Sequence, residues 1–488
     1  MMLEQILYNL KTLDTKECYQ VNNKVYAYKH VYKYVCNMYN YLLENNSEKR
    51  PVIVYGHKEV YMIASFLACS LAGITYIPID NSTPAQRVNS IIEQTTPNLI
   101  IGDFMSHSVK NLSTSEIMQI IEADDYKQIE NIYLNQNDTY YIIFTSGSTG
   151  VPKGVEITYN NLNCCIDWLK SIADINQGVV LNQANFSFDL SVADIYLSLV
   201  TGSKHYILER DVQKNFRLLF NSLSSSNSSL AVMTPSFVDL LLVDRAFNQK
   251  LMPNLKKILF CGETLLYSTV KKIYDRFDNI QIINLYGPTE CTVAVTYYNV
   301  PKNIERNKPI SLGKPKYDVK IHIVDENLNT LPDGQTGEIL ILGKSVGKGY
   351  LGSNKNNNRF ITFNGEKAYL TGDLGYIKNG NLYYKCRKDK QIKYNGYRIE
   401  LDDIESNLYK LEYIEKVIVL AKKKQNLKIT KLLAFVKLID GVDKTPIEIK
   451  TDLLTMIPKY MCPNIKIISS FPLNKNGKCD KSKLLEEF

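Results

Sequence analysis

The sequence predicts an α/β protein. It has a large N-terminal region of βαβ units with a small β-rich subdomain, followed by a smaller, mobile α+β C-terminal domain. Three observations predict this class. Apolar, β-branched runs alternate with amphipathic helical stretches through most of the first 300 residues. Short strands separated by Gly and Asn turns replace them after about Pro301, and a mixed pattern returns from about Asp389. A chain of 488 residues is long enough for two or three domains.

The βαβ pattern can be followed along the chain. Its most apolar stretch runs from Val60 to Asp80 and is interrupted by Gly73 and Pro78, so we expect a buried helix that turns into a strand and not a membrane span. We expect strands at 51–57, 74–79, 98–101, 256–263 and 280–287, and helices at 59–71, 84–95 and 270–277.

The change of periodicity gives the predicted domains. Residues 1–388 form the N-terminal domain, residues about 301–388 form its β-rich subdomain, and residues 389–488 form the C-terminal domain. The strands of the subdomain are expected within 319–343 and 375–386. The serine-rich patch at 222–229 is expected to be a surface loop.

Composition limits the functional classes. Ten cysteines without a C-x-x-C pair predict reduced thiols in a cytosolic compartment, and five histidines show no metal-ligand spacing. The N-terminus carries Glu4 where a signal peptide would carry positive charge and has no small-residue cleavage site. We therefore expect a cytoplasmic protein with no membrane insertion.

The net charge of +8 is unevenly distributed. From Asp389 to the end, 19 Lys and Arg face 14 Asp and Glu, which leaves +5 in the last 100 residues. Because no dense basic stripe with interleaved aromatic residues is present, nucleic acid is not expected as a partner. The bias fits an acidic partner protein better.

The stretch "FTSGSTGVPKGV", Phe144 to Val155, carries the first chemical motif. A Gly/Ser/Thr loop that follows a strand and ends in a lysine offers backbone N–H groups, hydroxyls and one cation to phosphates. The Walker pattern is absent because Lys153 follows Pro152 and precedes Gly154, so a P-loop NTPase is not predicted. On these grounds alone, a flexible surface loop stays an alternative.

The same string resembles the phosphate-loop signature of the adenylate-forming superfamily. Five further similar motifs follow in the order of that superfamily, and they are "FSFDLS" (186–191), "NLYGPTE" (284–290), "YLTGDLG" (369–375), "RKDKQIKYNGYRIELDDIE" (387–405) and "NKNGKCDK" (474–481). Within the superfamily the chain most resembles the D-alanine:D-alanyl-carrier-protein ligases, through stretches such as "VIVYGHKE", "YIPIDNSTPAQR" and "NQANFSFDLSVADIYLSLVTG". Two positions depart from the pattern. Cys386 replaces the usual glycine before Arg387, and Cys291 stands where alanine is common.

The resemblance implies a reaction in two halves. The D-alanine carboxylate attacks the α-phosphate of ATP to give an acyl-adenylate and pyrophosphate, with Mg²⁺ as the metal. The phosphopantetheine thiol of an acidic carrier protein then takes the acyl group and releases AMP, for teichoic acid D-alanylation. Such a site works by positioning and preorganised positive charge.

The resemblance also implies site residues. Glu290 holds Mg²⁺, Thr289 bonds the α-phosphate, Tyr286 lies against adenine, Asp373 takes the ribose hydroxyls and Arg387 assists at ribose or phosphate. Lys478 neutralises the charge that develops in adenylation. The remaining expected nucleotide-binding residues are Thr145, Ser146, Gly147, Ser148, Thr149, Gly150, Lys153, Asn284 and Gly287. The plain alternatives are a turn aspartate for Asp373 and a surface lysine for Lys478.

Two residues are expected to set selectivity. Asp189 matches the carboxylate that amino-acid-activating members present to the α-ammonium of the substrate. Cys261 stands where such relatives often have glycine, so its side chain would favour a small substrate of one hand. The alternative for Cys261 is a buried core cysteine.

Asp389 is the expected hinge, about which the C-terminal domain rotates between the two half-reactions. Two other functions stay open. One is a stand-alone adenylation enzyme for another small amino acid, which feeds a biosynthetic carrier protein. The other is an inactive nucleotide-binding homologue, although Glu290 and Lys478 are both present. An acyl-CoA synthetase is disfavoured because Asp189 would face an apolar tail.

Overall fold

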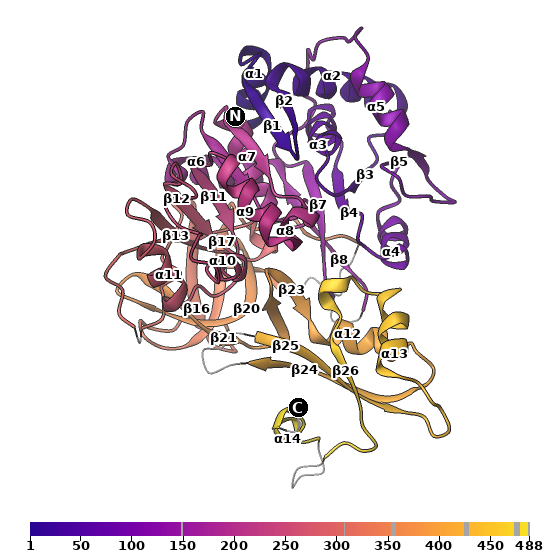
Figure 1. Cartoon of the computed structure of the whole chain (residues 1–488), viewed down its shortest axis with the longest axis vertical. Helices are drawn as coiled ribbons and strands as arrows, with labels where there is room; N and C mark the ends of the chain where they lie inside the picture. Colours follow the sequence, from indigo (N-terminus) through magenta and orange to yellow (C-terminus); the bar gives the residue numbers. More distant parts are fainter. Residues whose placement is uncertain (148–149, 307, 353–357, 424–428, 473–478, 487–488) are drawn as a thin grey trace. The chain divides into compact units, whose positions relative to one another are not determined.

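The computed structural model of the protein describes residues 1–147, 150–306, 308–352, 358–423, 429–472 and 479–486 (Figure 1). Two compact units are present. The large unit contains residues 1–81, 95–143 and 154–388, and the small unit contains residues 82–94, 144–153 and 389–488. The small unit thus includes two segments that the sequence prediction assigned to the N-terminal domain. The division into functional domains at 388 and 389 stays a prediction.

Two largely parallel sheets form the body of the large unit. The nine-stranded sheet runs in the order β15 (Lys314–Pro315), β14 (Thr296–Val300), β13 (Gln281–Tyr286), β12 (Lys257–Phe260), β11 (Leu230–Met233), β9 (Val179–Asn182), β10 (Lys204–Ile207), β1 (Glu17–Val21) and β2 (Lys24–Ala27). The seven-stranded sheet runs in the order β18 (Gly349–Tyr350), β8 (Lys153–Thr158), β7 (Thr139–Thr145), β4 (Tyr76–Asp80), β3 (Val52–Gly56), β5 (Leu99–Ile101) and β6 (Lys110–Leu112).

Connecting helices accompany these strands, as βαβ units require. The first part of the most apolar stretch is the buried helix α3 (Val60–Ala72), which ends at Gly73 with φ 73° before β4 begins. The predicted helix that turns into a strand is confirmed. The other helices of the unit are α1 (Met2–Thr12), α2 (Tyr28–Asn45), α5 (Thr114–Glu122), α6 (Tyr159–Ala173), α7 (Leu190–Val200), α8 (Arg210–Lys214), α9 (Phe216–Ser225), α10 (Pro235–Leu241), α11 (Tyr267–Tyr274) and the 3₁₀ turn η1 (Thr289–Cys291).

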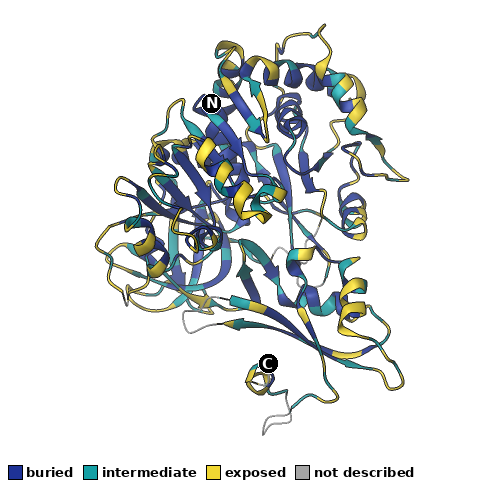
Figure 2. Cartoon of the chain, in the orientation of Figure 1, coloured by how far each residue is buried: buried dark blue, intermediate teal, exposed yellow. Residues whose placement is uncertain are grey.

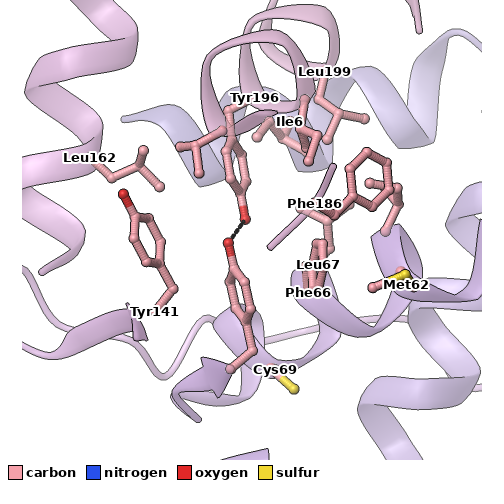
Figure 3. Packing of buried hydrophobic residues seen from close by; sticks show 14 of the residues in the cluster. Ile6, Met62, Phe66, Leu67, Cys69, Tyr141, Leu162, Phe186, Tyr196 and Leu199 are labelled. Carbon is pink, nitrogen blue, oxygen red and sulfur yellow. Dashed lines mark hydrogen bonds between the residues drawn. The ribbon is translucent and has the colours of Figure 1, made fainter. Parts of the chain in front are cut away.

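The central strands of the nine-stranded sheet, such as β11 and β12, are buried on both faces, which is why they read as continuous hydrophobic runs. Successive side chains alternate between two cores. Val180 and Val232 pack in the core with α3, α6 and α7, whereas Leu181 and Met233 pack against α9, α10 and α11. Figure 3 shows part of the first core. There the hydroxyls of Tyr196 and Tyr76 lie 2.9 Å apart and share a hydrogen bond, surrounded by apolar side chains. Both faces of these strands are therefore filled by packing, and function is left to the ends of the strands.

The expected surface loop at 222–229 is wrong for both halves of the patch. Residues up to Ser225 belong to α9, and Ser226 and Ser228 are buried. The Ser226 hydroxyl donates to the carbonyl of Leu223 at 2.8 Å, and the Ser228 hydroxyl donates to Ser226 at 2.9 Å. Hydroxyls that are satisfied in this way allow a serine-rich segment to be buried.

The predicted β-rich subdomain is present in the large unit. Its five-stranded antiparallel sheet comprises β16 (Val319–Val324), β17 (Gly337–Gly343), β20 (Glu366–Lys378), β19 (Phe360–Phe363) and β21 (Asn381–Arg387). The register between β20 and β21 places Asp373 opposite Arg387. Two expected nucleotide-binding residues are therefore cross-strand neighbours.

The small unit is α+β, as predicted. Its sheet of β24 (Ile414–Lys423), β25 (Ile429–Leu438) and β26 (Asn464–Ile467) packs with the hairpin of β22 (Gln391–Tyr394) and β23 (Tyr397–Glu400) in one apolar core. Helix α4 (Ala85–Thr95) contributes Arg87, whose guanidinium lies 3.3 Å from the buried carboxylate of Asp403. The remaining elements are α12 (Leu401–Leu408), α13 (Pro446–Leu454), η2 (Lys459–Met461) and α14 (Lys481–Glu486).

Burial follows the architecture (Figure 2). The parallel strands of the large unit are dark blue, whereas helices such as α9 carry one exposed side. Across the described ranges, no helix combines the length and the apolar character that crossing a membrane requires.

Candidate active site

Three of the predicted nucleotide-binding residues meet in the large unit, where β13 ends beside β20 and β21. The Tyr286 hydroxyl donates to one carboxylate oxygen of Asp373 at 2.7 Å, and the Arg387 guanidinium donates to the other at 3.0 Å. Only 3% of Asp373 is exposed. Arg387 also donates to the carbonyl of Thr371 at 2.8 Å. The carboxylate is thus held from both sides in a fixed orientation.

The electrostatics of this cluster follow from its burial. Burial, and after it the negative charge of Asp373, raises the pKa of the Tyr286 phenol well above its usual value. Tyr286 therefore stays a hydrogen-bond donor at neutral pH. Asp373 lies inside strand β20 and not in a turn, so the alternative of an ordinary turn aspartate does not describe its position.

Thr289 and Glu290 lie in η1, three and four residues after β13 ends, and both are buried. The Tyr350 hydroxyl donates to the Glu290 carboxylate at 2.6 Å. Tyr350 was not predicted as a site residue from the sequence. Upstream, the Asn284 amide donates to the carbonyl of Ser311 at 2.9 Å, so it orders the neighbouring chain. A Cβ on Gly287 would lie 2.6 Å from the Cα of Ala294, which requires glycine there.

The backbone directly after η1 is strained. Thr292 and Val293 have φ values of 56° and 68°, and the left-handed region is unfavourable for a β-branched side chain. The Thr292 hydroxyl donates to the carbonyl of Ser345 at 2.9 Å, which helps to hold this conformation. Strain of this kind is common at functional sites, and local propensity in the sequence gave no indication of it.

The predicted phosphate loop belongs to the small unit, and the structure describes part of it. Thr145 ends β7 and Lys153 begins β8. The Ser146 hydroxyl donates to the carbonyl of Arg398 at 3.1 Å and accepts from the N–H of Glu400 at 3.2 Å. Ser148, Thr149 and the predicted catalytic Lys478 lie outside the described residues.

Glycine is required at two positions of this loop. A Cβ on Gly147 would lie 2.1 Å from the carbonyl oxygen of Val151, and Gly150 has φ 77°. At the predicted hinge, the half-buried Asp389 accepts from the N–H of Gln391 at 3.1 Å, just before β22. Its role as a hinge stays a prediction.

The two predicted selectivity residues lie in the large unit. Asp189 precedes α7, and its carboxylate makes no capping hydrogen bond with that helix. The Tyr141 phenol is fully buried, and this burial is the main cause that raises its pKa. The negative charge of Asp189 is the second cause. Cys261 follows β12, is buried in the core and directs its sulfur toward the carbonyl of Val293 at 3.8 Å. Both proposed roles for Cys261, in selectivity and in packing, stay open.

Comparison with known proteins settles the family. Residues 10–351 match the family model described as AMP-binding enzyme. This chain belongs to the AMP-binding enzyme family. The match confirms the resemblance to the adenylate-forming superfamily, and ATP use follows from that membership.

Two curated relatives match along almost the whole chain. The "D-alanine--D-alanyl carrier protein ligase" of Listeria monocytogenes serovar 1/2a is 38% identical over 488 residues, which covers 96% of each chain. The protein of the same name from Bacillus cereus strain G9842 is 40% identical over 459 residues, 90% of each chain. The resemblance to these ligases is therefore confirmed.

Solved structures show the fold. An adenylation domain from Vibrio cholerae in complex with glycyl-adenosine-5'-phosphate superposes with a TM-score of 0.87 at 22% identity, and covers 100% of this chain and 97% of that one. An amide bond synthetase from Marinactinospora thermotolerans gives a TM-score of 0.86 at 18% identity and covers 99% of both chains. The predicted α/β class is confirmed.

One buried charged residue of this AMP-binding enzyme was missed by sequence reasoning. Lys58 is 1% exposed, and its ammonium donates to the carbonyls of Gln183 at 3.0 Å and Leu208 at 2.8 Å. Burial lowers the pKa of Lys58 to about 7, although Asp194 and Asp80 act in the opposite direction. The Gln183 carbonyl lies six residues before Asp189, so Lys58 anchors the segment that leads to the predicted ammonium-binding carboxylate.

Proposed function

We propose that this chain activates D-alanine with ATP and transfers the D-alanyl group to a carrier protein. The observation that carries the proposal is end-to-end similarity, at 38–40% identity over 90–96% of the chain, to proteins named for this reaction. That similarity spans residues of both compact units, including the C-terminal residues beyond the AMP-binding match.

In the first half-reaction, an oxygen of the D-alanine carboxylate bonds to the α-phosphorus of ATP, and the bond to the pyrophosphate oxygen breaks. Asp373, fixed by Tyr286 and Arg387, binds the ribose hydroxyls in this proposal, because an oriented carboxylate accepts two hydroxyl protons well. The ring of Tyr286 lies against the adenine. Asp189 pairs with the α-ammonium of D-alanine.

Glu290 suits a magnesium ion by its chemistry. It offers a carboxylate oxygen, the ligand type that a hard cation takes, while substrate phosphates supply further ligands. Its carboxylate is fully buried and held by Tyr350 at 2.6 Å, so it is preorganised. Bound Mg²⁺ would neutralise phosphate charge. Thr289 donates to the α-phosphate, and the loop from Ser146 to Lys153 holds the β- and γ-phosphates.

In the second half-reaction, the carrier thiol loses its proton and attacks the acyl carbon, and the bond to the AMP oxygen breaks. In this proposal Lys478 acts in the first half-reaction, and the C-terminal domain rotates about Asp389 before the second. The +5 charge from Asp389 onward supports an acidic, phosphopantetheinylated carrier protein as partner. We further propose a cytoplasmic enzyme that serves teichoic acid D-alanylation.

The test is amino-acid-dependent exchange of labelled pyrophosphate into ATP, measured across a panel of small D- and L-amino acids. We expect D-alanine to lead the panel. Dominance of an L-amino acid or a larger side chain would replace D-alanine by another substrate within the same chemistry. Exchange with no member of the panel, together with intact ATP binding, would support an inactive homologue.

A further inference from the structure

A short segment of the large unit, Ser345–Tyr350, bonds to two places that the proposed function uses. The N–H of Gly347 donates to the carbonyl of Glu290 at 2.8 Å, and the N–H of Lys348 donates to the carbonyl of Glu156 at 2.8 Å. Tyr350 then pairs with Val155 in β8. Strand β8 begins at Lys153, the last residue of the predicted phosphate loop. The segment therefore ties the strand after that loop to the backbone of Glu290.

The side chain of Tyr350 repeats this connection. Its hydroxyl lies 2.6 Å from the Glu290 carboxylate, a distance typical of a strong hydrogen bond to a charged acceptor, and 3.2 Å from the Tyr369 hydroxyl. Glu290 and Tyr369 are fully buried, and Tyr350 is 7% exposed. The Tyr350 ring packs edge-on against Phe360, with centroids 5.3 Å apart. Packing thus fixes the ring, and the ring fixes the hydroxyl.

We propose that Tyr350 is a positioning residue for the metal-nucleotide site, an inference that rests on the proposed role of Glu290. Its hydroxyl holds the Glu290 carboxylate in one orientation, while β18 holds Tyr350 in register with the strand that follows the phosphate loop. Such a donor offsets part of the free-energy cost of keeping a buried carboxylate charged. It also restricts the carboxylate to one orientation. Partners of this kind are worth about 10–100-fold in metal affinity at known metal sites.

The experiment compares Tyr350→Phe with wild type and uses Tyr376→Phe as the matched control. Tyr350→Phe removes the hydroxyl and keeps the ring that packs on Phe360. Tyr376 is likewise a tyrosine on a strand of the large unit, β20, and its ring is stacked on Tyr383 with centroids 5.2 Å apart. The readout is binding of Mn²⁺, used as the spectroscopic probe for Mg²⁺, to the full chain with saturating ATP by electron paramagnetic resonance. ATP binding in EDTA is measured by calorimetry in parallel.

We expect Tyr350→Phe to weaken Mn²⁺ binding by about 10-fold or more. ATP affinity in EDTA should stay within about twofold of the wild-type value, because the lost hydroxyl acts on the metal ligand. The Mg²⁺ concentration that half-saturates pyrophosphate exchange should rise. Tyr376→Phe should match wild type. Unchanged Mn²⁺ affinity in Tyr350→Phe overturns the proposal. A loss of ATP affinity in EDTA as large as the loss of Mn²⁺ affinity also overturns the proposal, because it reveals a purely structural tyrosine.

The inference and the proposed function can fail separately. If wild type shows D-alanine-dependent pyrophosphate exchange and Tyr350→Phe binds Mn²⁺ normally, only the proposed role of Tyr350 is removed. Wild type without exchange for any amino acid removes the proposed function, and the Mn²⁺ titration still decides the role of Tyr350.

Discussion

The buried ammonium of Lys58 makes the stability of the large unit depend on pH. Its folded-state pKa is about 7, against 10.5 for an ordinary lysine, with burial as the main cause. Below pH 7 both the folded and the unfolded chain bind the proton, so the cost of burying the charge is fully present. Between 7 and 10.5 only the unfolded chain binds it, so the free energy of unfolding rises with pH. Above 10.5 neither state binds it, and the cost of burying the charge is gone.

The size of this effect follows from the two pKa values. Each pH unit inside the window adds at most ~1.4 kcal/mol to the free energy of unfolding, so a rise from pH 7.5 to 9 adds about 2 kcal/mol. Lys58→Met removes the titrating group and keeps an unbranched, apolar side chain in the core. The variant should therefore lack this increment, so the free energy of unfolding of wild type relative to the variant should rise with pH across the window.

Urea unfolding at several pH values measures the difference. The single tryptophan, Trp168, is buried in α6 of the large unit, so its fluorescence reports the unit that contains Lys58. Lys214→Met, which changes an exposed lysine of α8, is the control and should follow wild type. Parallel pH curves for wild type and Lys58→Met would refute the reasoning, because they would mean that the Lys58 amine keeps its proton across the window.

Two further predictions concern the reaction. Cys261→Ala should enlarge the site and admit L-alanine or serine better by about 1–3 kcal/mol in pyrophosphate exchange, whereas an unchanged preference would remove Cys261 from the selectivity argument and leave it a core residue. Lys478→Ala should cripple adenylate formation and spare thiol transfer from supplied D-alanyl-adenylate, while Asp389→Pro, which fixes φ, should spare adenylation and block transfer. Equal slowing of both half-reactions by both variants in single-turnover assays would contradict the rotation about Asp389.

Local patterns predicted the elements well, because burial and periodicity act over short stretches of chain. The apolar run that ends at Gly73 became α3 because glycine takes the left-handed conformation, and the antiparallel subdomain followed from Gly and Asn turns. Motif resemblance supplied the members of the cluster around Asp373. The sequence alone could not supply its geometry, since Tyr286 and Asp373 are 87 residues apart.

The contacts that were missed are all long-range. Lys58 binds a carbonyl 125 residues away, and Tyr350 binds Glu290 across 60 residues. Neither residue stands out by type or spacing, because a lysine after a strand and a tyrosine after a glycine are both ordinary on the surface. The assignment of 82–94 and 144–153 to the small unit was missed for the same reason, since it depends on contacts such as Arg87 with Asp403.

The central claim is the transfer of D-alanine to a carrier thiol, and intact-mass spectrometry of the carrier measures it directly. A phosphopantetheinylated carrier protein incubated with the enzyme, ATP, Mg²⁺ and D-alanine should gain the mass of one alanyl residue, and AMP should appear in equal amount. The gain should disappear on treatment with hydroxylamine, which cleaves thioesters, and L-alanine should give far less of it. AMP release without a gain in carrier mass, or an equal gain with L-alanine, would contradict the account.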